Sequence, residues 1–205
     1  MIDWIFFVPA CFALNLAFGP NNLLAMTHGA KAGVSFAQKA ALGRLLIFVP
    51  MITVSALGLG IILTASALIF GIVKAFGAAY LIWLGISLWR HARTMEVTQI
   101  SAHPAHLGRA FRSEAMVALS NPKAILIFAA FFPQFVVPEN YWHSYAMLGA
   151  AFLLMEAAAI FAYALAGRLA SKFASGRLQT MQRISGVTMC IFGILLLVSP
   201  PPSRS

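Results

Sequence analysis

The chain has 205 residues, of which 61% are hydrophobic and only 9% are charged, and its formal net charge is +9. This composition excludes a soluble globular domain, which is about half apolar and about a quarter charged, and a disordered chain, which is poor in apolar residues. The basic excess would suggest a nucleic-acid partner in a soluble protein, but here the charges lie between apolar blocks, where a lipid bilayer explains them better.

The apolar blocks predict membrane-spanning helices, each of which needs about 20 apolar residues. Reading between the charges gives six approximate spans, at residues 4–26, 45–66, 69–89, 112–136, 145–167 and 184–198. These blocks lack the alternation of apolar and polar residues that a strand of a membrane barrel would have. The sequence therefore predicts an all-α integral membrane protein, with six transmembrane helices in a single domain at 1–205.

The basic residues of the connections are unevenly divided between the two sides of the predicted bundle. One side has Lys31, Lys39, Arg44, Arg90, Arg93, Arg109, Arg112, Arg168, Lys172, Arg177 and Arg183. The other side has only Lys74 and Arg204. Because basic connections stay in the cytoplasm, we expect both chain termini to lie outside.

Three spans in each half predict that the second half enters the membrane inverted relative to the first. A short echo supports this, since Gly19-Pro20-Asn21-Asn22 lies in the first span and Ser120-Asn121-Pro122-Lys123 in the fourth, although motifs this short could match by chance. Inverted repeats with broken helices are common in secondary transporters, where the substrate binds between the breaks. We therefore expect a first repeat at 1–90, a cytoplasmic connection at 91–111 and a second repeat at 112–199.

Both motifs contain a proline, which lacks an amide hydrogen and clashes with the carbonyl group four residues before it. Pro20 should free the carbonyl group of Leu16, and Pro122 that of Ala118. In hydrocarbon each carbonyl group then needs another partner. The side chains that could supply one, or bind a polar solute, are Asn15, Asn21, Asn22 and Asn121. Proline kinks joined by asparagine side chains are the alternative, but two motifs at comparable depth favour a site.

Lys123 and Glu156 lie well inside apolar spans, where a centrally placed charge costs about 2.5–3.5 kcal/mol. A carboxyl group at this depth could exchange a proton, as a proton-coupled carrier requires. The alternative is a fixed ion pair that joins the fourth and fifth helices. Tyr163 lies two helical turns beyond Glu156 and could line the same pathway or fill the core.

The remaining polar residues do not predict catalysis. Arg44, Glu114 and Arg168 fall at the ends of predicted spans, where long side chains usually extend to the interface. The sequence has no Ser/His/Asp set, phosphate-binding glycine loop or cluster of metal ligands, and its longest connection, about 90–112, is too short for a catalytic domain. We therefore expect neither an enzyme nor a cofactor or metal site.

Longer motifs follow one another along nearly the whole chain. They are Gly19–Ala30, Leu42–Arg44, Phe76–Gly85, Ser120–Ala124, Phe132–Val136 and Arg183–Gly186. Together these motifs resemble the LysE/RhtB family of amino-acid exporters, with matching order and chain length. The resemblance implies a multi-pass protein of about six helices in the bacterial inner membrane. It also implies export of amino acids or their derivatives, usually driven by the proton gradient.

The same resemblance implies that the translocation site comprises Gly19, Pro20, Asn21, Asn22, Asn121, Pro122 and Lys123. Glu156 stands where many members of the family have an acidic residue. Two departures are visible: many members have Thr-Pro-Gly-Pro where this chain has Ala-Phe-Gly-Pro at 17–20, and many have Asp where it has Asn21. The loss of that carboxylate shifts the expected coupling role to Glu156.

The sequence as a whole predicts an exporter of small zwitterionic solutes that alternates access around the two broken helices. Asn21, Asn22 and Asn121 would contact the amino acid, Lys123 would pair with its carboxylate, and Glu156 would bind its ammonium group or a proton. The expected partners are this substrate, protons and the bilayer, and no nucleic acid. A thin bundle of six helices is also compatible with a homodimer. The alternatives are a cation or heavy-metal exporter, a lipid-acting membrane enzyme and a membrane subunit without transport activity.

Overall fold

The computed structural model describes residues 1–65, 67–91, 106–170 and 176–198, and within these ranges every element is a helix. The elements are α1 (Trp4–Leu16), α2 (Pro20–Ala32), α3 (Val34–Ala65), α4 (Ala67–His91), α5 (Leu107–Leu119), α6 (Pro122–Leu126), the π-helix η1 (Ile127–Phe131), the 3₁₀ helices η2 (Phe132–Phe135) and η3 (Pro138–Asn140), α7 (Tyr141–Ala170) and α8 (Gly176–Val198). The all-α prediction is confirmed for these residues. Most of the predicted connection 91–111 lies outside them, as do Arg93, Lys172 and Arg204.

Two of these helical stretches, Val34–Gly58 and Pro138–Leu169, are long and apolar enough to cross a membrane without a break. Two further stretches qualify only as bent pairs: α1 with α2 at 61°, and α5 with Lys123–Phe135 at 51°. In α4 the apolar stretch is shorter, Ala75–Ser87. By length and composition the described helices therefore give two spans, or four if each bent pair counts as one. The total of six stays a prediction.

The prolines of the two motifs begin new helices and do not kink continuous ones. Pro20 is the first residue of α2 after Gly19, whose backbone is extended. Pro122 likewise opens α6 after Asn121, whose side chain accepts a hydrogen bond from the amide of Lys123 at 3.0 Å. A proline at the first helical position loses nothing, because its missing amide would have had no partner in the helix. Each motif is therefore a break between two helices.

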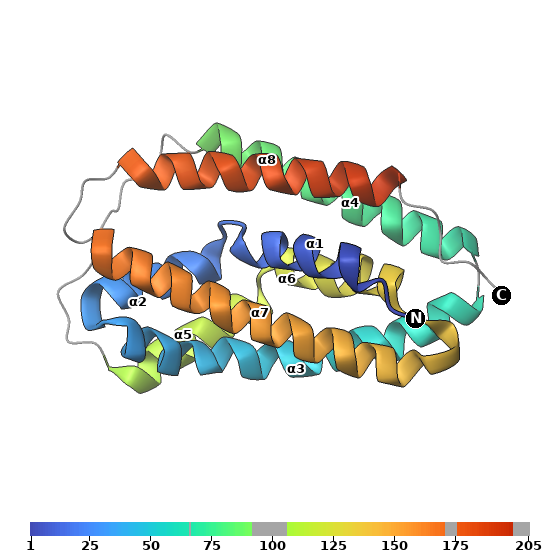
Figure 1. Ribbon diagram of the computed structural model, residues 1–205, viewed down its shortest axis with the longest axis horizontal. Helices are drawn as coiled ribbons and strands as arrows, with labels where there is room; N and C mark the ends of the chain where they lie inside the picture. The colour runs from blue at the N-terminus through green and yellow to red at the C-terminus, as the bar shows by residue number, and fades with distance from the viewer. Residues whose placement is uncertain (66, 92–105, 171–175, 199–205) are drawn as a thin grey trace.

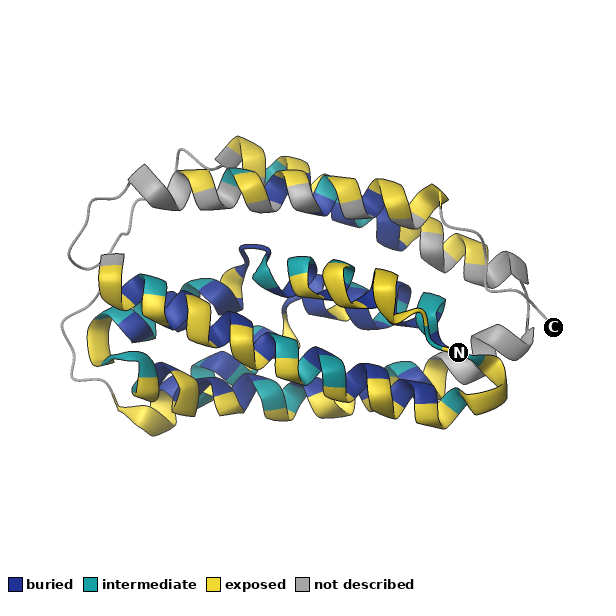
Figure 2. Ribbon diagram, viewed as in Figure 1, coloured by how far each residue is buried: buried dark blue, intermediate teal, exposed yellow. Residues whose placement is uncertain are grey.

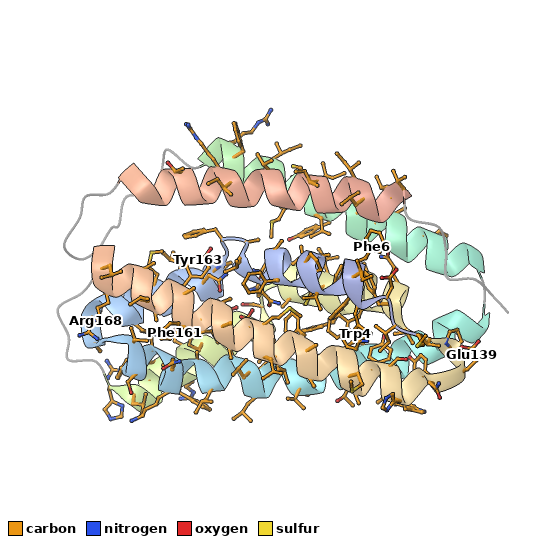
Figure 3. All side chains as sticks on the ribbon, in the orientation of Figure 1. Trp4, Phe6, Glu139, Phe161, Tyr163 and Arg168 are labelled. Carbon is orange, nitrogen blue, oxygen red and sulfur yellow. The ribbon has the colours of Figure 1, made fainter. Side chains whose placement is uncertain are left out.

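The helices lie roughly along one common direction, with α1 and α6 between α3 and α7 on one side and α4 and α8 on the other, and with α5 alongside α3 (Figure 1). α1 begins and α8 ends at the same end of the molecule. The α2–α3 turn, the start of α5 and the end of α7 lie at the other end (Figure 1). Arg168 lies at this second end and Glu139 at the first (Figure 3). We call the second end the basic end, because Lys31, Arg109, Arg112 and Arg168 belong to the elements that meet there.

The outer faces of the helices are apolar and exposed, as lipid-facing surfaces are (Figure 2). The core beneath them is rich in aromatic residues. Phe128, Phe132 and Phe152 meet edge to face, with ring centroids 4.9–5.7 Å apart. This cluster packs η1, η2 and α7 together and holds the second broken helix against an unbroken one.

Glycines allow several pairs of helices to approach until their backbones are in contact. Such close packing matters in lipid, because membrane helices gain no hydrophobic free energy by associating with each other. In the α4–α8 pair, a β-carbon at Gly85 would lie 2.5 Å from the carbonyl oxygen of Gly186 and 2.6 Å from Sγ of Cys190. In the α2–α7 pair, a β-carbon at Gly29 or Gly167 would clash with a carbonyl oxygen of the other helix. These pairs therefore tolerate no larger residue at their crossing points.

We predict that Gly85→Val destabilises the protein and lowers its thermal unfolding midpoint in detergent by about 5 °C, because the added methyl groups separate α4 from α8. Gly71→Val is the matched control on the same helix, since a β-carbon at Gly71 meets nothing within 4 Å. Equal midpoints for the two variants would show that α4 and α8 do not pack as described.

Candidate functional site

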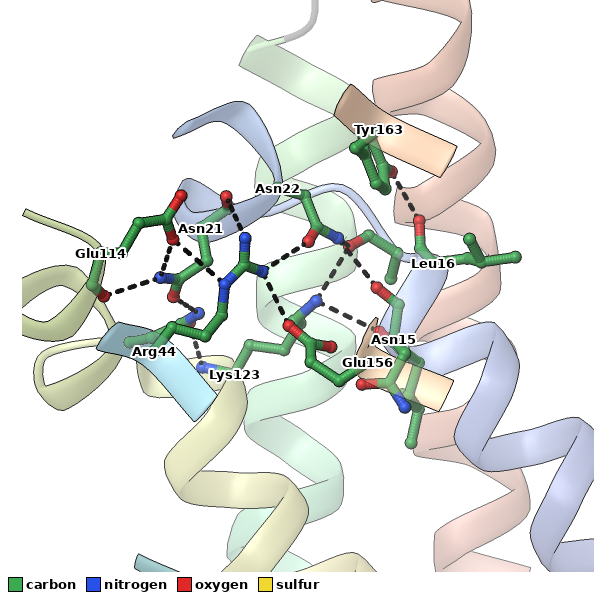
Figure 4. A network of polar contacts seen from close by, with 12 residues as sticks. Asn15, Leu16, Asn21, Asn22, Arg44, Glu114, Lys123, Glu156 and Tyr163 are labelled. Carbon is green, nitrogen blue, oxygen red and sulfur yellow. Dashed lines mark hydrogen bonds and ion pairs between the residues drawn. The ribbon is translucent and has the colours of Figure 1, made fainter. Parts of the chain in front are cut away.

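The two helix breaks meet in the middle of the bundle. The side-chain amide of Asn121 donates to Oδ1 of Asn21 at 2.8 Å, which joins the α5–α6 break to the start of α2 (Figure 4). Both asparagines are buried, as is Asn22 beside them. The structure thus brings together the motifs that the sequence places at comparable depth.

Lys123 crosses from the second break to the first. Its ammonium group donates to the carbonyl oxygens of Leu14 at 3.1 Å and Ala17 at 2.9 Å, at the end of α1. The side chain is only 7% exposed. A helix end carries partial negative charge on its free carbonyl groups, so a cation there is favourable. Lys123 therefore holds the broken end of α1 against α6.

Other polar side chains bond the remaining carbonyl groups at the end of α1. Asn22 donates to the carbonyl oxygens of Asn15 at 2.8 Å and Ala17 at 2.9 Å. The Tyr163 hydroxyl group donates to the carbonyl oxygen of Leu16 at 2.6 Å. The carbonyl group predicted to be freed by Pro20 thus has a partner, and Tyr163 supplies it from α7. Oδ1 of Asn15 is buried and has no hydrogen-bond partner in the described structure.

Arg44 lies at the centre of this cluster and is completely buried, with 0% exposure. It donates to the carbonyl oxygen of Asn21 at 2.9 Å, to Oδ1 of Asn22 at 3.1 Å and to Oε1 of Glu156 at 2.7 Å. Its Nε also lies 3.1 Å from Oε2 of Glu114. One guanidinium group therefore contacts the first break and two carboxylates (Figure 4).

The prediction that Arg44 and Glu114 lie at helix ends and extend to the interface is wrong, whereas Arg168 does lie exposed in the last turn of α7. The error came from treating charges as markers of span ends. α3 already begins at Val34 and α5 at Leu107, so both side chains lie well inside their helices. Gly43 is a sequence feature that indicates a close helix contact next to Arg44, because a β-carbon there would clash with the carbonyl oxygen of Phe111. This close approach of α3 to α5 places Arg44 beside Glu114.

Glu156 is 4% exposed and pairs with Arg44. The alternative of a fixed pair between Glu156 and Lys123 is therefore not the arrangement seen, since the Lys123 ammonium group is bonded to backbone carbonyl groups of α1. Glu114 is also completely buried, and its Oε2 accepts from the side chain of Asn21 at 3.3 Å. Residues from six helices thus share one connected set of polar contacts.

The charges in this set balance when every group is ionised. Arg44 and Lys123 carry two positive charges, and Glu114 and Glu156 carry two negative ones. A buried charge without a partner is very unfavourable, so this balance is what makes the cluster tolerable in a bundle surrounded by lipid. Among the described residues, no three His, Cys, Asp or Glu side chains lie close enough together to hold a metal ion.

Comparisons with known proteins show which family of sequences this chain resembles. The family model of the LysE type translocator matches residues 12–200. An uncharacterized membrane protein of Vibrio cholerae is 30% identical over 196 residues, covering 94% of this chain and 95% of that protein. A homoserine/homoserine lactone efflux protein of Salmonella typhimurium is 31% identical over 196 residues, with the same coverage. An uncharacterized membrane protein of Pseudomonas aeruginosa is 36% identical over 156 residues, covering 74% of this chain and 69% of that protein. No solved structure matches the chain.

We predict that Arg44→Met strongly destabilises the protein, because it leaves Glu114 and Glu156 buried without their cation. The loss should be about 3–5 kcal/mol, or roughly 10 °C in the thermal unfolding midpoint. Adding Glu156→Gln should recover part of the loss, because it removes one of the two unpaired charges. Arg112→Met, at an exposed position on α5, is the control and should unfold close to the wild type. A midpoint for Arg44→Met within about 2 °C of the wild type would mean that Arg44 does not hold the cluster together.

Proposed function

We propose that this chain, which belongs to the LysE type translocator family, exports amino acids or amino-acid derivatives from the cell. Members of that family are membrane transporters and not enzymes. Two relatives that align with nearly the whole chain are homoserine/homoserine lactone efflux proteins. L-Homoserine is therefore the first substrate to test.

The observation that carries the proposal is the neutral, buried set of charges at the two helix breaks. Ionisable groups inside a membrane protein usually mark a substrate or ion pathway. A zwitterion fits this set, because its carboxylate can take the place of Glu156 on Arg44 while its ammonium group pairs with the released Glu156. The net charge of the site then stays unchanged, which avoids the penalty of an unpaired buried charge.

Other residues complete the proposed site. The ammonium group needs several acceptors, and Oδ1 of Asn15 is a buried acceptor whose hydrogen-bonding capacity is unused in the described structure. Asn21, Asn22 and Asn121 contact the substrate with their amide groups as it passes between the breaks. Lys123 and Tyr163 keep the end of α1 bonded, and Lys123 offers a second positive charge to the carboxylate. Gly19, Pro20 and Pro122 set the geometry of the breaks.

Transport of this kind requires two alternating openings, and an inverted repeat supplies them. The proposed architecture has six spans. The first repeat, at 1–90, contains α1–α2, α3 and α4 except for its last residue. The second repeat, at 112–199, contains α5 from Arg112 onward, the helices from α6 to η2, α7 and α8. Two bent pairs with similar angles and with proline at the same helical position support this. The basic end faces the cytoplasm and both termini lie outside, in the bacterial inner membrane. A homodimer stays a prediction from the sequence.

Export of a metal cation is the weaker candidate. Metal sites need several oxygen, nitrogen or sulfur ligands, and the carboxylates of Glu114 and Glu156 already contact Arg44. The cluster would have to lose these contacts before it could hold a cation.

The test of the proposal is transport by the purified protein in proteoliposomes. We expect saturable movement of labelled L-homoserine and of a few related amino acids, and accumulation against a gradient when a pH difference is imposed. Failure to move any amino acid in a broad panel would contradict the proposal. Transport that ignores the pH difference would keep the exporter and remove its coupling to protons.

We predict that Glu156→Gln lowers the rate of L-homoserine transport by about tenfold or more, because the substrate's ammonium group loses its counter-charge. Glu139→Gln, at an exposed position on the opposite end of the molecule from the basic end, should transport at the wild-type rate. Full pH-driven export by Glu156→Gln would exclude Glu156 from both substrate binding and coupling.

A further inference from the structure

One contact at the edge of the polar cluster is left unexplained by substrate binding. Nδ1 of His28, on α2, lies 3.4 Å from Oε1 of Glu114, on α5. Both atoms are buried, and neither has a hydrogen-bond partner in the described structure. Two polar atoms that lack partners and face each other over this distance indicate a site that a small ligand can complete.

The chemistry of the contact identifies the ligand as a proton. A carboxylate oxygen is only an acceptor, and a histidine nitrogen without hydrogen is also an acceptor. Two acceptors in a buried contact repel, so at least one proton must lie on His28 Nδ1 or on Glu114 Oε1. This proton can pass between the two atoms without any other group moving far, because Nδ1 and Oε1 already lie 3.4 Å apart.

Glu114 connects this proton to the rest of the site through its second oxygen. Oε2 lies 3.1 Å from Nε of Arg44 and accepts from Nδ2 of Asn21 at 3.3 Å. Protonation of Oε1 removes the negative charge that Oε2 presents to Arg44. Arg44 then pairs with Glu156 more strongly, and Glu156 becomes less available to a substrate ammonium group. A bound proton and a bound substrate therefore oppose each other, as an exporter driven by inward proton flow requires.

Of the two side chains, that of His28 is the one partly exposed to water. α2 runs from the first break to the α2–α3 turn at this end, and the His28 side chain is 13% exposed. α5 packs against α3 and α2, and from these Arg44 and His28 are the charged or titratable groups in contact with Glu114. α3 also places Phe36 against the His28 ring. α7 approaches α2 most closely at Ala164 and Gly167, and the charged residue of α7 next to these positions is Arg168.

We infer that His28 and Glu114 form the binding site of the coupled proton, distinct from the substrate site at Glu156, and that His28 exchanges this proton with water at the basic end. In one direction, imidazolium at His28 gives its Nδ1 proton to Oε1 of Glu114, so an N–H bond breaks, an O–H bond forms, and both groups become neutral. The reverse step returns the proton to His28, which releases it to water. This inference rests on the proposed transport function.

Two assays in proteoliposomes separate the proton site from the substrate site. Counterflow of labelled against unlabelled L-homoserine at equal pH needs only the substrate site. Accumulation driven by an imposed pH difference also needs the proton site. The variants are His28→Asn and Glu114→Gln, and the matched controls are His143→Asn and Glu139→Gln, both at exposed positions.

We expect His28→Asn to keep counterflow within about twofold of the wild type while pH-driven accumulation falls about fivefold or more. Glu114→Gln should lose at least as much accumulation, and its counterflow should fall as well, because this substitution also removes a negative charge from the neutral cluster around Arg44. Because Glu114 is buried and its variant could fail to fold, the partly exposed His28 decides the outcome. Wild-type accumulation in His28→Asn would overturn the inference, and so would loss of counterflow in this variant, because His28 lies outside the proposed substrate site.

The same assays keep the inference separate from the proposed function. A wild-type protein that exchanges L-homoserine but ignores the pH difference would overturn the proton site and leave the exporter intact. A wild-type protein that exchanges neither L-homoserine nor any other amino acid of the panel would overturn the proposed function, and the proton site with it.

Discussion

The structure depends on the need to bond every carbonyl group at the end of α1 inside the protein. Hydrocarbon offers no donor to a broken helix, so the break is possible only where other helices bring donors to it. Lys123 of α6, Asn22 of α2 and Tyr163 of α7 supply these donors. The break in α1–α2 is therefore stabilised by donors from α2, α6 and α7. These donors place several polar side chains at the point where a polar substrate would pass.

Bringing Lys123 and Arg44 to this place creates a second requirement, because two buried cations need two anions. Glu114 and Glu156 meet this requirement, and Arg44 contacts both. The result is a site that is neutral as a whole but consists of separable charges. A zwitterion can replace the Arg44–Glu156 ion pair of such a site, with its carboxylate on Arg44 and its ammonium group on Glu156. A change in the charge of Glu114 also changes how strongly Arg44 binds Glu156. Satisfying the broken helix and binding a substrate are therefore two uses of the same side chains.

The sequence predicts the helical class, both breaks and most of the polar residues around them, because proline and buried charge have strong local signals. It fails for Arg44 and Glu114, which lie inside helices that extend well beyond the apolar blocks. A charged residue marks the end of a span only where its side chain reaches the interface. Arg44 and Glu114 are instead paired with each other inside the bundle, so their positions do not mark the ends of spans. The sequence also leaves open a fixed ion pair between Lys123 and Glu156, and only the structure shows that the Lys123 ammonium group instead donates to the carbonyl groups at the end of α1. Only the packing of α3 on α5 and α7 settles which charges meet.

The central claim is that the buried cluster recognises both charges of an amino acid, and binding of a matched pair of ligands tests it most directly. L-Homoserine and 4-hydroxybutanoate share the same carbon chain, hydroxyl group and carboxylate, but only the first has an ammonium group. Isothermal titration of the purified protein in detergent should give at least about tenfold weaker binding of 4-hydroxybutanoate, because its lone negative charge unbalances the neutral site and leaves Glu156 unpaired. Equal affinity for the two ligands would contradict the account.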